Sequence, residues 1–171
     1  MNPSVPSVII IIAPGGFRDE ELFETKELLE KEVTVEIASK TTEEVTGMLG
    51  GKIKPDRLIN TIDTDDVDAI VFIGGSGVIK YFNDEAVLRI TSLAYEKGVL
   101  LAAICIAPSI LANAGVLEGV KATSFPSEKD NLQSKGAIYT DEGVTRDKKV
   151  ITAKGPDFTK EFAREIIKAL H

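Results

Sequence analysis

The single cysteine of the chain, Cys105, is the residue whose type and setting point most directly to chemistry. It follows a fully apolar strand predicted over residues 99–104 and precedes a helix predicted to reach about Asn113. A nucleophile elbow has this order, because a sharp strand-to-helix turn holds a reactive side chain above the sheet. So tight a turn requires small residues two positions before and after it, and these are Ala103 and Ala107. The pattern predicts a nucleophilic thiol at the elbow.

A lone cysteine also has a simpler interpretation, as a small buried hydrophobic residue. Its setting argues against that. Backbone N–H groups at a helix start favour the thiolate, so we expect a lowered pKa for Cys105. Pro108 fits the first helical turn, where a missing N–H breaks no hydrogen bond. The elbow context therefore favours the reactive interpretation.

A second candidate segment, Gly74-Gly75-Ser76-Gly77, ends a short buried strand predicted over residues 69–73. In parallel sheets, reactive groups gather beyond the carboxyl ends of the strands, where this segment and Cys105 would meet. The backbone N–H groups of Gly75 and Ile106 could then form an oxyanion-binding pocket. A tight turn with no role in the chemistry is the alternative.

The elements that must position these groups alternate between strand and helix, which predicts an α/β fold with a mostly parallel sheet and helices on both faces. Residues 48–59 are predicted to form a small hairpin or excursion. A capping-box-like start, Ser127 followed by Asp130, predicts a short helix. The remaining predicted strands are 5–13, 33–38, 121–123, 137–139 and 150–153, and the remaining helices are 19–31, 84–97 and 157–170.

Composition limits what such a site can contain. The 171 residues suit one domain, residues 1–171, with 43% hydrophobic and 27% charged residues and a net charge of −7. One cysteine and one histidine, His171, exclude an internal disulfide and leave almost no material for a metal site, so we expect no metal and no cofactor. The scattered basic residues argue against nucleic acid as a partner. The apolar run at residues 8–13 is too short for a membrane span and lacks a preceding basic segment, so a cytoplasmic protein is expected.

Four motifs together resemble the ThiJ/PfpI superfamily. They are Ala-Ala-Ile-Cys105, Asp19-x-Glu21 after the first strand, the Gly74-Gly75 pair, and Thr152-Ala153-Lys154-Gly155-Pro156 before the last helix. The resemblance implies a flavodoxin-like three-layer α/β/α sandwich, related to class I glutamine amidotransferase domains. It also implies a homodimer or a higher homo-oligomer.

The resemblance assigns roles to four residues. Cys105 corresponds to the elbow nucleophile, Glu21 to a glutamate that hydrogen-bonds it, and the N–H groups of Gly75 and Ile106 to the oxyanion pocket. Acids in a helix's first turn also suit the helix dipole, which is the simpler interpretation of Glu21. However, Glu21 lies about 100° around the helix from its neighbour Glu20. A carboxyl group that points inward there should be desolvated and have a raised pKa.

This sequence also departs from the family pattern. PfpI-type peptidases carry histidine immediately after the cysteine, where this chain has Ile106. The deglycase branch carries histidine before a proline beside the site, where this chain has Phe125, and Lys154 replaces an arginine. An imidazole could come only from His171 of a neighbouring subunit, so a Cys–His–acid triad is not expected.

Three functions follow from these residues. In the first, Cys105 attacks a small reactive aldehyde such as methylglyoxal and Glu21 moves the proton, as in glyoxalase or deglycase chemistry. In the second, the protein is a redox-sensing or chaperone-like stress protein whose Cys105 is oxidised to a sulfinate. The third, a PfpI-type intracellular cysteine peptidase, is disfavoured because no histidine is available. The expected partner is therefore a small aldehyde or an oxidant.

Overall fold

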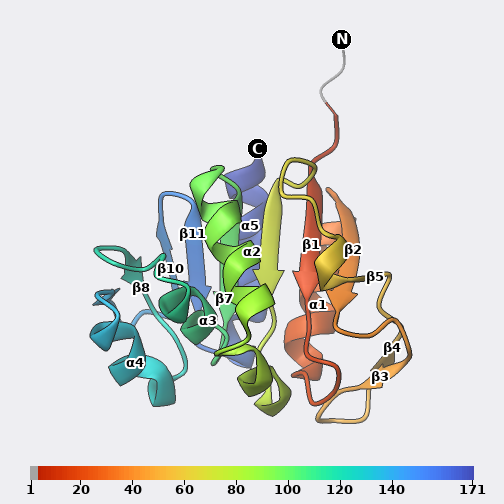
Figure 1. Cartoon of the computed structure of the whole chain (residues 1–171), viewed down its shortest axis with the longest axis horizontal. Coiled ribbons are helices and arrows are strands. Elements are labelled where there is room, and N and C mark those ends of the chain that lie inside the picture. Colours follow the sequence, from red (N-terminus) through yellow and green to blue (C-terminus); the bar gives the residue numbers. More distant parts are fainter. Residues whose placement is uncertain (1–3) are drawn as a thin grey trace.

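A seven-stranded sheet forms the centre of the computed structural model, which describes residues 4–171 (Figure 1). Its strand order is β10-β11-β7-β6-β1-β2-β5, and every pairing is parallel except that of β10 with β11. The strands are β1 (Ser7–Ile11), β2 (Thr34–Ser39), β5 (Arg57–Leu58), β6 (Ala69–Phe72), β7 (Leu100–Ile104), β10 (Val144–Asp147) and β11 (Val150–Ala153).

Both faces of this sheet are buried, which explains the continuous apolar runs in its central strands. In β1, Ile9 and Ile11 belong to one hydrophobic cluster, whereas Val8 and Ile10 belong to another on the opposite face. Side chains alternate across a strand, so each apolar strand contributes to two cores. The predicted α/β architecture with a mostly parallel sheet is confirmed.

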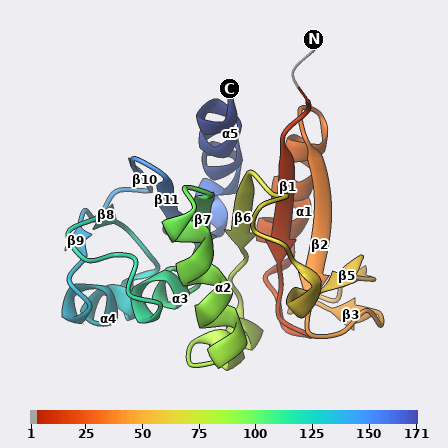
Figure 2. The same cartoon turned by 45° about the horizontal axis from the view of Figure 1, so that its top comes forward.

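Helices cover the two faces as separate layers (Figures 1 and 2). Helices α1 (Asp19–Glu30) and α5 (Thr159–Leu170) pack side by side over one face, and α2 (Glu85–Glu96) and α3 (Pro108–Asn113) cover the other. The short α4 (Lys129–Ser134) packs on α3 at the margin of the sheet. The expected three-layer sandwich is therefore present.

The local predictions differ from the structure in three places. The 48–59 excursion contains β4 (Lys52–Ile53), which pairs with the unpredicted β3 (Val45–Thr46). Strand β10 was not predicted at all. The predicted capping box at Ser127 is wrong. The Ser127 hydroxyl donates to the Glu128 side chain at 2.7 Å, and a 3-10 turn over Pro126–Glu128 precedes α4.

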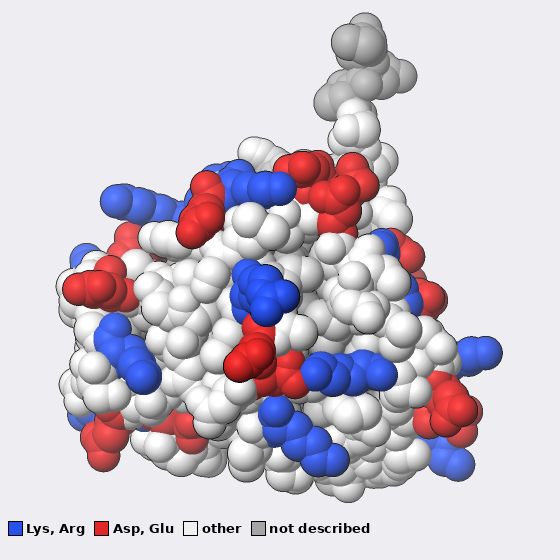
Figure 3. Space-filling model, viewed as in Figure 1, with Lys and Arg blue, Asp and Glu red and all other residues white. Residues whose placement is uncertain are grey.

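Two minor strands complete the fold, β8 (Lys121–Ala122) and β9 (Ile138–Tyr139), paired in parallel beside α4. Acidic and basic side chains are interspersed over the face drawn in Figure 3. Within residues 4–171, no helix has the length and apolar character needed to cross a membrane. The same residues hold no group of three or more His, Cys, Asp or Glu side chains arranged to hold a metal ion.

Candidate active site

Cys105 occupies a strained turn directly after β7. Its backbone φ of 65° lies in the left-handed region, which residues with a side chain adopt only at a cost of about 1–3 kcal/mol. Hydrogen bonds on both sides hold it there: the Cys105 N–H donates to the Ala153 carbonyl at 2.9 Å, and its carbonyl accepts from the Phe125 N–H at 2.7 Å. The side chain is half-buried rather than enclosed. The sequence therefore folds into the predicted elbow at this position.

Two backbone N–H groups reach the sulfur of Cys105. Those of Gly75 and Ile106 hydrogen-bond it, and both interactions lower the pKa of the thiol. Gly75 can turn its N–H inward because its φ is 101°, and a Cβ there would lie 2.4 Å from the backbone nitrogen of Arg18. Only glycine fits this close approach of the β6 and β1 loops. The two N–H groups named in the predicted oxyanion pocket thus lie beside the thiol.

Glu21 lies in the first turn of α1 and its side chain is completely buried. Its Oε1 accepts a hydrogen bond from the Gly74 N–H at 2.9 Å, whereas Oε2 has no conventional hydrogen-bond partner among the described residues. Burial raises the pKa of Glu21 to about 7, against the lowering effects of the Gly74 N–H, the Cys105 thiol and the Arg18 guanidinium. A buried carboxyl group with an unpaired oxygen is unusual, because desolvation of its charged form is costly.

Gly74 is the residue that brings the thiol and the carboxyl group together. A Cβ atom at this position would lie 2.6 Å from the Cβ of Cys105 and 2.7 Å from Oε1 of Glu21. The two side chains therefore flank one point that only a glycine leaves free. Sequence reasoning noted the Gly74-Gly75 pair but gave Gly74 no role, since a glycine pattern does not show what its missing side chain would meet.

The expected lowering of the cysteine pKa is wrong. Burial raises the pKa of the Cys105 thiol to about 12, the Glu21 carboxylate adds to that increase, and the two N–H groups only partly oppose it. The thiol and the carboxyl group thus titrate as a coupled pair, in which the carboxyl group loses its proton before the thiol does. The Glu21 carboxylate lies within reach of the thiol proton, and its pKa is close to the value that suits proton transfer at neutral pH.

Arg18 supplies a positive charge that the sequence analysis did not identify. Its guanidinium pairs with Glu20 at 2.9 Å and is one-third exposed. The same charge interacts favourably with the anionic forms of Glu21 and Cys105, and these interactions contribute to raising the pKa of Arg18. The sequence Arg18-Asp19-Glu20-Glu21 contains this cation, but the pattern alone does not show which of the acids it interacts with.

The positions at which the family places histidine hold no imidazole. Phe125 lies next to the elbow through its bond to the Cys105 carbonyl, and Ile106 follows the nucleophile. His171 lies 3.7 Å from Glu32, which precedes β2, whereas Cys105 follows the carboxyl end of β7. Within the described part of one chain, therefore, the carboxyl group that lies beside the thiol is that of Glu21.

Comparison with known proteins gives a consistent family assignment. Residues 6–169 match the model of the DJ-1/PfpI family. Over 99% of its length the chain is 42% identical to an uncharacterised protein of Methanocaldococcus jannaschii, of which it covers 84%. A deglycase of Thermococcus kodakarensis is 33% identical over 95% of this chain and 98% of that protein.

Two further matches bear on activity and fold. A glutathione-independent glyoxalase of Caenorhabditis elegans is 28% identical over 96% of this chain and 88% of that protein. The crystal structure of a ThiJ/PfpI domain protein from Brachyspira murdochii superposes with a TM-score of 0.95, at 27% identity and 98% coverage of both chains.

Proposed function

This chain belongs to the DJ-1/PfpI family, and from that premise we propose that it converts small 2-oxoaldehydes such as methylglyoxal to hydroxy acids without a cofactor. Relatives named deglycase and glutathione-independent glyoxalase support this class of reaction. In the proposal Cys105 is the nucleophile, Glu21 the acid–base group, and the N–H groups of Gly75 and Ile106 bind the developing oxyanion.

The chemistry needs one nucleophile and one proton carrier. Glu21 takes the thiol proton as the sulfur of Cys105 adds to the aldehyde carbon, and the carbonyl oxygen, held by the two N–H groups, then receives a proton to give a hemithioacetal. Movement of the C1 proton to C2 through Glu21, with transfer of the hydroxyl proton from the C1 oxygen to the C2 oxygen, converts the hemithioacetal to a thioester of the 2-hydroxy acid. Water cleaves that thioester, which releases the hydroxy acid and restores the thiol. The net reaction consumes one water and needs no external oxidant or reductant.

The buried Glu21 carboxyl group carries this proposal. Burial raises its pKa to about 7, close to neutral pH, so it can both accept and return a proton in one cycle. Two acids in the first turn of α1 are buried: Asp19 accepts from the N–H groups of Leu49 and Gly51, whereas Glu21 lies beside the thiol.

The test is the loss of methylglyoxal and the appearance of lactate with purified protein, free of glutathione and treated with chelator. Cys105→Ala should abolish turnover, and Glu21→Gln should reduce kcat by roughly 10²–10⁴-fold, the usual contribution of a general acid–base group. Glu27→Gln is a matched control, because Glu27 is an exposed glutamate of the same helix. Turnover that survives in Cys105→Ala would exclude the proposal.

Oxidation of Cys105 is a second candidate, favoured by the half-buried thiol and by the raised pKa of the neighbouring Glu21 carboxyl group. A protonated Glu21 could donate a hydrogen bond to a cysteine sulfinate. Mild peroxide should then add two oxygens to Cys105 in the wild type and not in Glu21→Gln, as read by mass spectrometry. The peptidase function finds no support in the site, and the homodimer and the cytoplasmic location stay predictions.

A further inference from the structure

A groove of about 190 Å³ opens on the β11 side of the elbow. Two aromatic rings and two prolines form most of its wall, with one lysine and one aspartate at its polar edge. The lining residues are Phe125, Pro126, Lys154, Gly155, Pro156, Asp157 and Phe158. Neither the nucleophile nor its acid–base partner belongs to this lining, so the proposed chemistry leaves the groove without a role.

Both walls of the groove are joined to the backbone of the nucleophile. The Phe125 N–H donates to the Cys105 carbonyl at 2.7 Å, and the Cys105 N–H donates to Ala153, the residue before Lys154, at 2.9 Å. Cys105 and Phe158 also pack against the same hydrophobic cluster. The oxyanion N–H group of Gly75 comes from β6, on the other side of β7. When Cys105 attacks a substrate, the carbonyl oxygen of the substrate therefore lies on the β6 side, and the groove lies on the opposite, β11 side.

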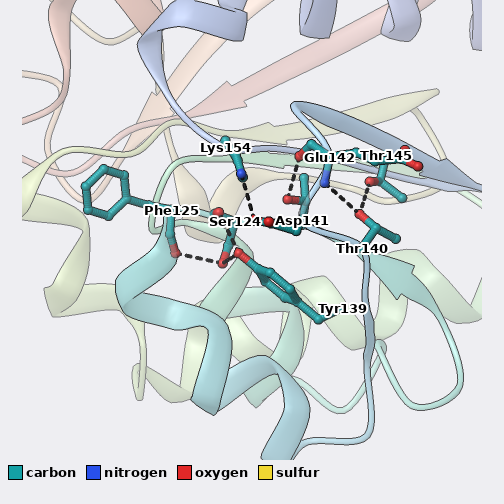
Figure 4. Close-up of polar contacts among 9 residues, drawn as sticks. Ser124, Phe125, Tyr139, Thr140, Asp141, Glu142, Thr145 and Lys154 are labelled. Carbon is teal, nitrogen blue, oxygen red and sulfur yellow. Dashed lines mark hydrogen bonds and ion pairs between the residues drawn. The ribbon is translucent and has the colours of Figure 1, made fainter.

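Hydrogen bonds fix the backbone around Phe125 on the side away from the groove. The Ser124 hydroxyl donates to the Phe125 carbonyl at 2.9 Å, and the Tyr139 hydroxyl donates to the Ser124 carbonyl at 2.9 Å. The preceding Thr123 N–H donates to the Thr152 side chain at 2.9 Å. Figure 4 shows the ring of Phe125 directed away from this polar cluster. The ring is 46% exposed although its backbone is fixed, which suits a preformed contact surface.

The charge of Lys154 is already matched within the chain. Its ammonium group lies 2.7 Å from a carboxylate oxygen of Asp141, and Figure 4 shows the side chain reaching toward that residue. The ion pair lowers the pKa of Asp141, which keeps the aspartate charged. The groove therefore offers no free cation to an anionic substituent, and its aromatic walls favour an apolar one.

We propose that this groove is the substituent subsite of the site at Cys105, and that it selects 2-oxoaldehydes with an aromatic or bulky apolar group, of the phenylglyoxal type, over methylglyoxal. This inference rests on the proposed function for the identity of the reacting group. A cavity of about 150 Å³ accepts a benzene ring, so the volume is sufficient for a phenyl substituent. Phe125, in the place of the family's histidine, is then a specificity-determining residue.

The first test compares kcat/KM for phenylglyoxal and for methylglyoxal. The wild type should prefer phenylglyoxal, and Phe125→Ala and Phe158→Ala should each reduce that preference at least about tenfold, because a hydrocarbon group in an apolar pocket changes kcat/KM by roughly 10–200-fold. Ile79→Ala is the matched control, since Ile79 is an apolar side chain, 57% exposed, that lies outside the groove. An unchanged ratio in both phenylalanine variants would overturn the inference, as would a change of oligomeric state in Phe125→Ala with the ratio intact.

A second readout does not depend on turnover. Cys105 is alkylated with 2-chloroacetophenone or with chloroacetone; the sulfur forms a bond to carbon and chloride leaves in both cases. The ratio of the alkylation rate with 2-chloroacetophenone to that with chloroacetone is divided by the same ratio measured for glutathione. This normalised ratio should exceed one in the wild type and decrease in Phe125→Ala. A protein that shows this preference but turns over neither aldehyde would refute the proposed function and retain the subsite. Turnover of both aldehydes with no aromatic preference would do the reverse.

Discussion

Replacement of Glu21 by glutamine should change how stability depends on pH. Burial raises the pKa of this carboxyl group from the ordinary 4.5 to about 7, so between these values the folded chain holds a proton that the unfolded chain has released. The contribution of Glu21 to the free energy of unfolding is then greatest below pH 4.5, decreases as the pH rises toward 7, and levels off above it. At 1.36 kcal/mol for each pKa unit, the decrease amounts to about 3 kcal/mol.

Glutamine has the same shape and does not titrate. The free energy of unfolding of Glu21→Gln should therefore lack the pH-dependent decrease of about 3 kcal/mol. Any change in stability that the amide itself causes should be the same at every pH. Urea unfolding of the two proteins at intervals between pH 4 and pH 8, followed by circular dichroism, gives the difference in unfolding free energy directly. Other titrating groups cancel in that difference, because both proteins contain them.

Glu27→Gln gives the matched comparison, since the same substitution at an exposed site of α1 should leave the pH dependence as in the wild type. If the difference between Glu21→Gln and the wild type is constant from pH 4 to pH 8, Glu21 is not desolvated. Glu21 would then also lack the near-neutral pKa that a base in the proposed function requires.

Two further substitutions test the surroundings of the pair. Gly74→Ala should reduce turnover of methylglyoxal at least about tenfold, because its methyl group would enter the space between Cys105 and Glu21. A shift of about 1 Å in the position of reacting groups can reduce the rate about 10²-fold. Turnover equal to that of the wild type would contradict this packing. Arg18→Gln should move the acidic limb of the pH profile of kcat/KM to higher pH, because the guanidinium lowers the pKa of Glu21. Arg146→Gln is the control: it removes an ion pair with Glu165 and should leave the acidic limb at its wild-type pH.

The layout of the fold was predictable because its signals are local. Apolar runs such as residues 99–104 are buried on both faces, and Asp84 caps α2 by accepting from the Val87 N–H, so strand and helix positions followed from the residues alone. Strand β10 was missed because it lies at the sheet edge, with one residue of its four buried and no apolar run to mark it.

The site was predictable in position but not in its electrostatics. The elbow pattern located Cys105, since the strand, the small flanking residues and the proline are all written in sequence. The pKa of the thiol depends on the balance between two N–H groups and the desolvation caused by the whole fold, which no local pattern contains. The same holds for Gly74 and for the groove at Phe125, which exist only because distant segments meet.

The absence of histidine from the site is compatible with an active thiol because of where the shared proton lies. From about pH 7 the pair of Cys105 and Glu21 carries one negative charge, which can lie on the carboxylate or on the sulfur. In the proposed function, Glu21 gains a proton when the charge moves to the sulfur, where the N–H groups of Gly75 and Ile106 stabilise that charge. When the sulfur adds to a carbonyl, the charge passes to an oxygen beside those donors. In the proposed function, the buried carboxyl group performs the proton transfer that an imidazole performs elsewhere, and burial brings its pKa close to neutrality.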